Sequence, residues 1–332
     1  MSESNFVLEA KGVVKRYAAH TALKNVNIQV PGQCIFGLLG PNGAGKTSLI
    51  RIINQITGPD QGSIYINGDR LNQDHIKDIG YLPEERGLYK KMKVGDQALY
   101  LAQLKGMKKS AAKKELLRWF EKFDITNWWD KKVEELSKGM AQKVQFITTI
   151  LHKPKLLIFD EPFTGFDPIN TKLIKEEILK LRDEGATVIL STHNMESVEE
   201  ICDQIALINN AENVLSGEMK KIKHDFSNKE YSIVFKGNVV SFANSFWGGF
   251  ELMSREQIAE NTFEAKIRLL GDVKLNDFLT GIIPNCEVQS LHPIVPSMND
   301  IFIQVVQNAK EQDLTNESTT SVGESTKGGH NE

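Results

Sequence analysis

The chain has 332 residues, more than one compact core usually holds, so we expect two domains and a tail. Its 40 Lys/Arg and 43 Asp/Glu give a net charge of -3, which excludes a global basic field that would attract nucleic acid. A hydrophobic content of 40% is typical of a soluble globular protein.

The chain contains no apolar run of the ~18 residues that span a bilayer, and its polar start MSESN does not resemble a signal peptide. We therefore expect a cytoplasmic protein. The cysteines are far apart and lack the spacing of metal ligands or disulfides, which favours buried, reduced thiols at Cys34, Cys202 and Cys286.

The first part of the chain predicts short strands, a glycine-rich turn and a helical region. Residues 6–30 contain β-like runs, and the apolar stretch QCIFGLLG (33–40) predicts a buried strand that enters the turn. From about 88 to 153 the pattern becomes helical and predicts a lobe beside the sheet. The lysine-rich run within it (105–123) predicts a solvated helix face, because acidic residues are interleaved.

Apolar strands return in KLLIFDE, ATVILSTH and QIALINN, with a helix at 170–184 between the first two. This alternation indicates a mostly parallel sheet covered on both faces, and hence an α/β fold. Beyond about 225, three alternating segments and a helix that Ser297 can cap indicate a small α+β domain (225–308). The last residues, 309–332, are almost free of apolar side chains and predict a disordered tail.

The segment GPNGAGKT has the Gly-x-x-x-x-Gly-Lys-Thr pattern of a phosphate-binding loop between a strand and a helix. Its glycines let backbone N–H groups surround the phosphates. Lys46 would contact the β- and γ-phosphates and Thr47 would bind Mg²⁺. We expect this loop and the start of the helix to bind the phosphates of a nucleotide through Gly40, Pro41, Asn42, Gly43, Ala44, Gly45, Lys46, Thr47 and Ser48.

Two later strand ends carry polar residues suited to hydrolysis. The buried strand LLIFDE ends in Asp160, placed to hold Mg²⁺, and Glu161, placed to orient or deprotonate a water molecule. His193 ends the strand TVILST, where a contact with the γ-phosphate or the water is expected. Strand ends of such sheets border the ligand crevice, which makes simple surface positions a poorer explanation.

The stretch ELSKGMAQKVQF places Ser137 and Gly139 before an amphipathic helix, whose N-terminus would favour an anion. Together with the phosphate loop, the carboxylate pair and the histidine, this motif resembles the nucleotide-binding subunit of ABC transporters over about residues 5–220. The resemblance implies a P-loop NTPase with an ABC-type helical subdomain. It also implies that two subunits meet head to tail, so that Ser137 and Gly139 bind the γ-phosphate on the partner.

The same resemblance assigns further positions. Tyr17 matches the aromatic residue that stacks on adenine, and Asp167 matches the acid of the loop along the dimer seam. Glu84 lies in the loop that senses the γ-phosphate and touches the membrane partner, where the family usually has glutamine. The signature also has Lys138 where glycine is usual and Met140 where glutamine is usual. These forms, and the C-terminal segment PSMNDIFI, resemble the sodium-export (NatA-like) group.

The resemblance implies the ATP-hydrolysing subunit of an exporter, which uses ATP and Mg²⁺ and drives a separate multi-spanning permease. The expected location is cytoplasmic, peripheral on the inner face of the cell membrane. The expected second partner is another ATP-binding subunit, in a homodimer or a pseudo-symmetric dimer, and no nucleic acid partner is expected. The alternative is a soluble ABC ATPase that acts on ribosomes or DNA. The cargo depends on the permease and is not encoded here.

Overall fold

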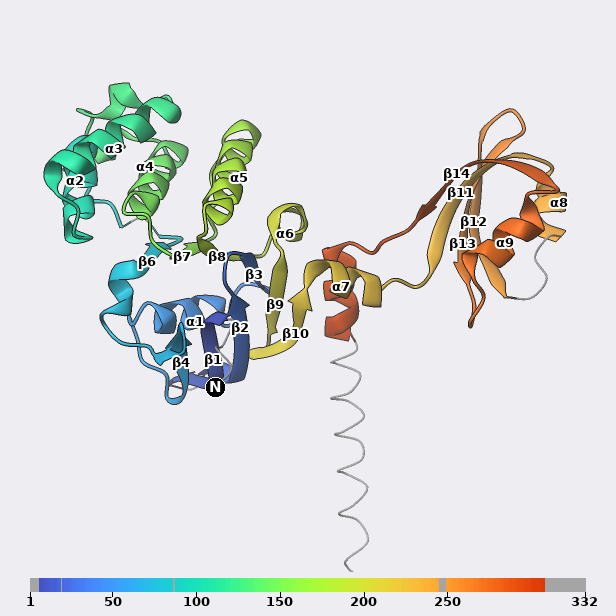
Figure 1. The fold of residues 1–332 in the computed structure, drawn as a ribbon, viewed down its shortest axis with the longest axis horizontal. Coiled ribbons are helices and arrows are strands. Elements are labelled where there is room, and N and C mark those ends of the chain that lie inside the picture. The colour runs from blue at the N-terminus through green and yellow to red at the C-terminus, as the bar shows by residue number, and fades with distance from the viewer. Residues whose placement is uncertain (1–5, 19, 86, 245–248, 308–332) are drawn as a thin grey trace, which may run out of the picture. The chain divides into compact units, whose positions relative to one another are not determined.

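The computed structural model describes residues 6–18, 20–85, 87–244 and 249–307. The chain forms two compact units, Met1–Met219 and Lys220–Asn308, and each is described by itself (Figure 1). The domain boundaries expected from the sequence remain predictions. The predicted disordered tail, 309–332, lies outside the described residues.

A six-stranded, mostly parallel sheet forms the centre of the first unit, with the strand order β10-β9-β3-β8-β7-β6. Only the β9–β10 pair is antiparallel among its pairs. Successive residues of a strand face opposite sides, so Ile158 joins the core around α1 while the Phe159 ring lies 5.4 Å from that of Phe146 on α4. The strands are β3 (Ile35–Leu39), β6 (Ile79–Leu82), β7 (Leu156–Asp160), β8 (Thr187–Thr192), β9 (Gln204–Asn209) and β10 (Glu212–Glu218).

An antiparallel sheet with the order β2-β1-β4-β5 belongs to the same unit. Its apolar residues share one buried cluster with α1 and with strands of the main sheet, so α1 is enclosed by both sheets. This enclosure fixes the start of α1 beside the end of β3. The elements are β1 (Phe6–Tyr17), β2 (His20–Pro31), β4 (Gln61–Ile66), β5 (Asp69–Arg70) and α1 (Lys46–Ile53).

Helices form a lobe between β6 and β7, where the sequence predicted one. Neighbouring aromatic rings connect Trp129 to Phe120, and Phe123 to Phe146. None of the helices in the described residues is long and apolar enough to cross a membrane. The lobe contains α2 (Val94–Leu104), α3 (Lys109–Lys122) and α4 (Lys138–Ile150), with 3-10 turns at Thr126–Trp128 and Val133–Glu135. Outside the lobe, a 3-10 turn at His75–Asp78 precedes β6, α5 (Pro168–Asp183) follows β7, and α6 (Met195–Ile201) follows β8.

The second unit has a four-stranded antiparallel sheet with the order β12-β13-β11-β14, packed on α8 and α9 around a cluster of buried phenylalanines. Ser297 caps the helix over 298–307, as expected, because its hydroxyl accepts a hydrogen bond from the backbone N of Asp300 (3.1 Å). The elements are α7 (Met219–Asp225), β11 (Glu230–Gly237), α8 (Val239–Asn244), β12 (Phe250–Ala259), β13 (Thr262–Leu269), α9 (Leu275–Ile282) and β14 (Cys286–Pro293).

The cysteine prediction needs one correction. Cys34 and Cys202 are buried free thiols, as expected, but Cys286 is only half-buried. It begins β14, an outer strand of its sheet, where one edge has no neighbouring strand among the described residues.

Candidate functional site

The glycine-rich loop joins the end of β3 to the start of α1 and leaves no room for side chains at two positions. A Cβ atom on Gly40 would lie 2.1 Å from the carbonyl oxygen of Ile208, and one on Gly45 would lie 2.3 Å from that of Ala22. Both glycines also have positive φ, of 144° and 119°. The loop therefore depends on glycine because neighbouring strand ends approach its backbone.

Lys46 lies under this loop and is only 6% exposed. Its Nζ donates hydrogen bonds to the carbonyl oxygens of Gly40 (2.7 Å) and Pro41 (3.1 Å). Burial lowers the pKa of Lys46, while the carboxylates of Glu161, Asp160 and Glu84 act in the opposite direction. A buried ammonium at the first turn of a helix provides charge for an anion.

Asp160 ends β7 and is 2% exposed. Its Oδ2 accepts a hydrogen bond from the Thr47 hydroxyl on α1 (3.3 Å), so the structure brings together the two predicted metal ligands. Burial raises the pKa of Asp160, and the negative charges of Glu84 and Glu161 also favour its protonated form. The site thus concentrates carboxylates in a place that would favour a cation.

Glu161 follows directly and adopts a left-handed backbone conformation with φ of 49°. Its Oε2 accepts a hydrogen bond from the Thr192 hydroxyl (3.0 Å), and its Oε1 accepts one from the backbone N of His193 (3.0 Å). The His193 Nδ1 also lies 2.6 Å from Oε1. A strained backbone held by several contacts is typical of functional sites, where the surroundings fix an unfavourable conformation.

Thr192 is the residue that the sequence analysis missed. It is 1% exposed, and its hydroxyl also accepts a hydrogen bond from the backbone N of Asn194 (3.1 Å). Its position directly before His193 in the strand TVILST was the available signal. The pairing of Asp160 with Ser191 across β7 and β8 places Thr192 beside Glu161.

The predicted signature residues lie at the start of α4, where the Ser137 hydroxyl accepts a hydrogen bond from the backbone N of Met140 (3.3 Å). A Cβ on Gly139 would approach the Gly165 carbonyl oxygen to 3.1 Å, so this motif packs on the loop before α5. Within the described ranges, no hydrogen bond or ion pair joins residues 137–139 to residues 40–48. The two predicted anion sites of the chain are therefore separate from each other within the described residues.

The remaining predicted positions lie around these features. Asp167 caps α5 by accepting a hydrogen bond from the backbone N of Asn170 (3.0 Å), and hydrogen bonds from this residue lower the pKa of Asp167. Glu84 is exposed just after β6. Tyr17 ends β1 with 42% of its surface exposed, and the Lys15 Nζ lies 5.3 Å from its ring centroid.

Of two hollows in this unit, one borders the glycine-rich loop and the other does not. One of about 380 Å³ borders it and is lined by Pro41–Ala44, His20, Thr21, Lys24 and Asn209–Ala211. Tyr17 is not among these lining residues.

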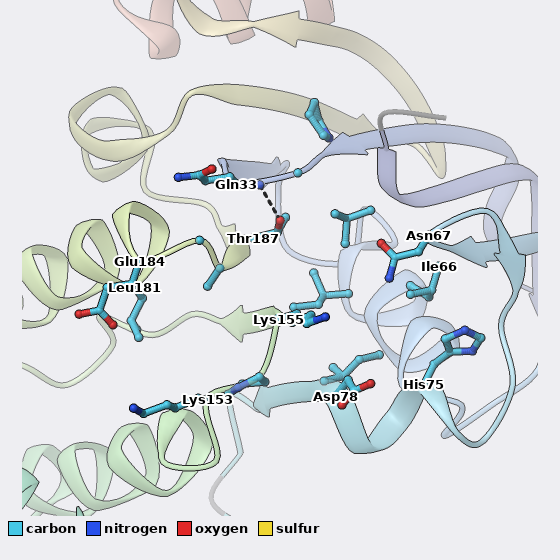
Figure 2. Close-up of a pocket in the computed structure, with 18 residues that line it drawn as sticks. Gln33, Ile66, Asn67, His75, Asp78, Lys153, Lys155, Leu181, Glu184 and Thr187 are labelled. Carbon is cyan, nitrogen blue, oxygen red and sulfur yellow. Dashed lines mark hydrogen bonds between the residues drawn. The ribbon is translucent and has the colours of Figure 1, made fainter. Parts of the chain in front are cut away.

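A larger hollow of about 720 Å³ lies at the amino ends of the parallel strands, where the backbone N of Gln33 donates a hydrogen bond to the Thr187 hydroxyl (2.9 Å; Figure 2). Ligands of such sheets bind at the carboxyl ends, so we assign the site to the loop side despite the larger volume here.

Comparison with known proteins agrees with this architecture. Residues 23–164 match the family model described as ABC transporter, and residues 217–306 match that of the ATP-binding protein DrrA1-3-like, C-terminal domain. Residues 132–199 also match an AAA domain described as putative AbiEii toxin, Type IV TA system. The fold is thus a P-loop NTPase with an ABC-type helical subdomain, followed by a small α+β domain.

Individual relatives place the chain in a family. YhaQ of Bacillus subtilis, an uncharacterized ABC transporter ATP-binding protein, is 42% identical over 299 residues, which cover 89% of this chain and 96% of YhaQ. The linearmycin resistance ATP-binding protein LnrL from the same organism is 33% identical over 214 residues (64% and 69%). NatA, an ABC transporter ATP-binding protein of that organism, is 30% identical over 223 residues (66% and 91%).

A solved structure of the ATP-binding subunit of an ABC transporter aligns with a TM-score of 0.62 at 30% identity, covering 66% of this chain and 93% of that structure. The chain belongs to the family of ABC transporter ATP-binding proteins. NatA, at 30% identity, is a more distant relative of the chain than YhaQ, at 42%.

Proposed function

We propose that the chain is the ATP-hydrolysing subunit of an ABC exporter and that it drives a separate membrane-spanning permease. The supporting observation is the meeting of Lys46, the Thr47–Asp160 pair and the Glu161–His193 pair at the carboxyl ends of β3, β7 and β8. ATP would bind along the loop with its phosphates against the N-terminus of α1, in the manner of helix-terminal anion sites. The binding residues are those predicted from the sequence.

The Thr47 hydroxyl and the Asp160 carboxylate would hold Mg²⁺. Their oxygens fit a hard cation, which prefers oxygen ligands. Among the described residues, no group of three or more His, Cys, Asp or Glu side chains could hold a metal ion by itself. Water and phosphate oxygens would therefore complete the coordination. Bound there, the ion would neutralise charge on the phosphates.

Glu161 would act as the general base that accepts a proton from the attacking water. Its own contacts support this role, because Thr192 and the backbone of His193 hold both carboxylate oxygens. The His193 imidazole would position Glu161 and contact the γ-phosphate. Glu84 stands where an amide is usual in the family and cannot donate as an amide does, so in our proposal it contributes charge near the ion.

The second anion-binding feature fits a head-to-tail dimer. In the described ranges, Ser137 and Gly139 have no hydrogen bond or ion pair with the loop of their own chain. We infer that they bind the γ-phosphate held by a second ATP-binding subunit, with Asp167 along the seam. ATP would then close the dimer, and hydrolysis would reopen it. The exporter assignment and a NatA-like grouping rest on motif resemblance and on relatives such as LnrL, and we place the chain at the cytoplasmic face of the cell membrane.

The experiment that tests hydrolysis compares Glu161→Gln with Glu176→Gln, a matched control on the exposed side of α5. We expect Glu161→Gln to bind ATP normally but to hydrolyse it roughly 10²–10⁴-fold more slowly, because the base is lost. Lys46→Ala should instead weaken binding itself. Normal hydrolysis by Glu161→Gln, measured as phosphate release, would remove Glu161 from the base role.

The experiment that tests transport is affinity purification of the chain from detergent-solubilised membranes of its host. We expect a multi-spanning partner at stoichiometric amount. Recovery of ribosomes or DNA-repair factors without any membrane protein would contradict the exporter and favour a soluble ABC ATPase.

A further inference from the structure

The helical lobe carries a concentration of positive charge that the ATP site does not use. Residues 88–153 contain 15 Lys/Arg and only 7 Asp/Glu, whereas the whole chain contains 40 and 43. Four lysines gather at the start of α3, and we call them the basic patch: Lys108, Lys109, Lys113 and Lys114. All four are exposed, and in the described structure none of their ammonium groups has a hydrogen bond or ion pair.

The basic patch opposes the local preference of the helix. Cations are unfavourable near a helix N-terminus, because the unpaired N–H groups already make that end positive. The first turn of α3 has no acidic residue, and Lys108 occupies the N-cap position without a side-chain cap. A cluster of cations that destabilises the start of a helix indicates that these lysines serve a function.

The acidic residues that favoured a solvated face, Glu115 and Glu121, both lie C-terminal to the four lysines of the basic patch. Glu115 is already engaged by Arg118, at 3.9 Å, and Glu121 is the last residue but one of α3. The prediction of a solvated, charge-balanced face therefore applies to residues 115–122 only. Residues 108–114 contain four lysines and no acidic side chain.

Exposed apolar side chains flank the basic patch. Leu104, the last residue of α2, is 64% exposed and lies four residues before Lys108. Leu117 is 45% exposed and lies one helical turn beyond Lys113 and Lys114. Lysines beside exposed leucines form an amphipathic surface, the type that binds at the boundary of a bilayer. Figure 1 shows α2 and α3 side by side at the outer end of the lobe.

We propose that the basic patch, with Leu104 and Leu117, docks on anionic phospholipid headgroups at the membrane surface. Charge complementarity supports this partner, since clusters of four or more basic residues attract anionic lipids. All four cations are lysines. A lysine ammonium acts as a point charge that can interact with many phosphate groups, whereas arginine binds a single phosphate through two parallel hydrogen bonds. The location of the surface rests on the proposed function, which places the chain beside a membrane protein.

The test is co-sedimentation of the full chain with vesicles, without nucleotide or permease. We expect binding to phosphatidylglycerol vesicles at low salt, none to phosphatidylcholine vesicles, and loss of binding at high salt. The variant Lys108→Gln/Lys109→Gln/Lys113→Gln/Lys114→Gln should bind roughly a hundredfold more weakly or worse. A control of equal net charge replaces four exposed lysines of the second unit with glutamine and should bind like the original chain: Lys220, Lys221, Lys236 and Lys266.

Thermal unfolding of the patch variant shows whether a loss of vesicle binding comes from misfolding. The patch variant should be at least as resistant to thermal unfolding as the original chain, because glutamine removes repulsion at the helix N-terminus. Equal vesicle binding by patch and control variants, or no binding to anionic vesicles, would overturn the proposal. Patch-dependent binding to an RNA or DNA oligonucleotide but not to vesicles would assign the surface to nucleic acid instead. Glu161→Gln should bind vesicles normally, so failure here is separate from failure of the proposed ATPase.

Discussion

Replacement of Asp160 with asparagine should make the nucleotide-free protein more stable while removing magnesium-dependent activity. The Asp160 carboxylate is 2% exposed, lies near the negative charges of Glu84 and Glu161, and accepts a hydrogen bond from the Thr47 hydroxyl at 3.3 Å. Burial raises its pKa above the ordinary value of 3.8, so its ionised form weakens the fold. Asparagine has nearly the same shape, keeps an acceptor for Thr47 and carries no charge.

We expect a gain of about 1–2 kcal/mol at neutral pH, typical of removing charge conflict at a functional site. For a unit of this size, that gain corresponds to roughly 2–8 °C in Tm. The gain should depend on pH. Between its raised folded pKa and 3.8, the folded original chain binds more protons than the unfolded chain, so it becomes more stable as pH falls. The advantage of Asp160→Asn should therefore shrink as pH decreases through that window.

The assay is thermal or urea unfolding of the nucleotide-free chain in chelator, at several pH values, followed by ATPase assays with Mg²⁺. Asp60→Asn is the control, because its effect on stability should have the opposite sign. Hydrogen bonds from the backbone N of Arg16 and from Lys15 lower the pKa of Asp60, so its ionised form supports the fold and Asp60→Asn should lose stability. A destabilised Asp160→Asn, or a gain that does not change with pH, would refute the reasoning.

Two further changes test the loop and the base. Gly45→Ala should lower the free energy of unfolding in urea by about 3–5 kcal/mol, because its Cβ would meet the Ala22 carbonyl oxygen in a left-handed backbone. Gly43→Ala should lower it by only about 1–2 kcal/mol, since nothing lies within 4 Å of its Cβ. Equal losses of stability would contradict the steric argument. Thr192→Val should lower kcat about tenfold by releasing Glu161, and Thr192→Ser should restore it; an unchanged kcat for valine would exclude a positioning role.

Part of the fold could be predicted because it depends on neighbouring residues. The alternation of apolar strands and helices predicted the parallel sheet, and the helical spacing between β6 and β7 predicted the lobe. The glycine pattern placed the loop between a strand and a helix, where β3 and α1 meet. The comparisons confirm the fold class. The prediction that Cys286 is buried was wrong, because outer and inner strands of a sheet have similar sequences in a short apolar segment, and Cys286 on an outer strand is only half-buried.

What the sequence by itself determined about this protein is its family, its order of elements and the polar residues at its strand ends, since each depends on spacing along the chain. Only the tertiary structure decided which groups touch. The register of β7 against β8 brings Thr192 to Glu161, and the approach of Ile208 to the loop makes Gly40 irreplaceable. These contacts join segments far apart in the chain, so their distances follow from the packing of both sheets around α1 and not from any local pattern.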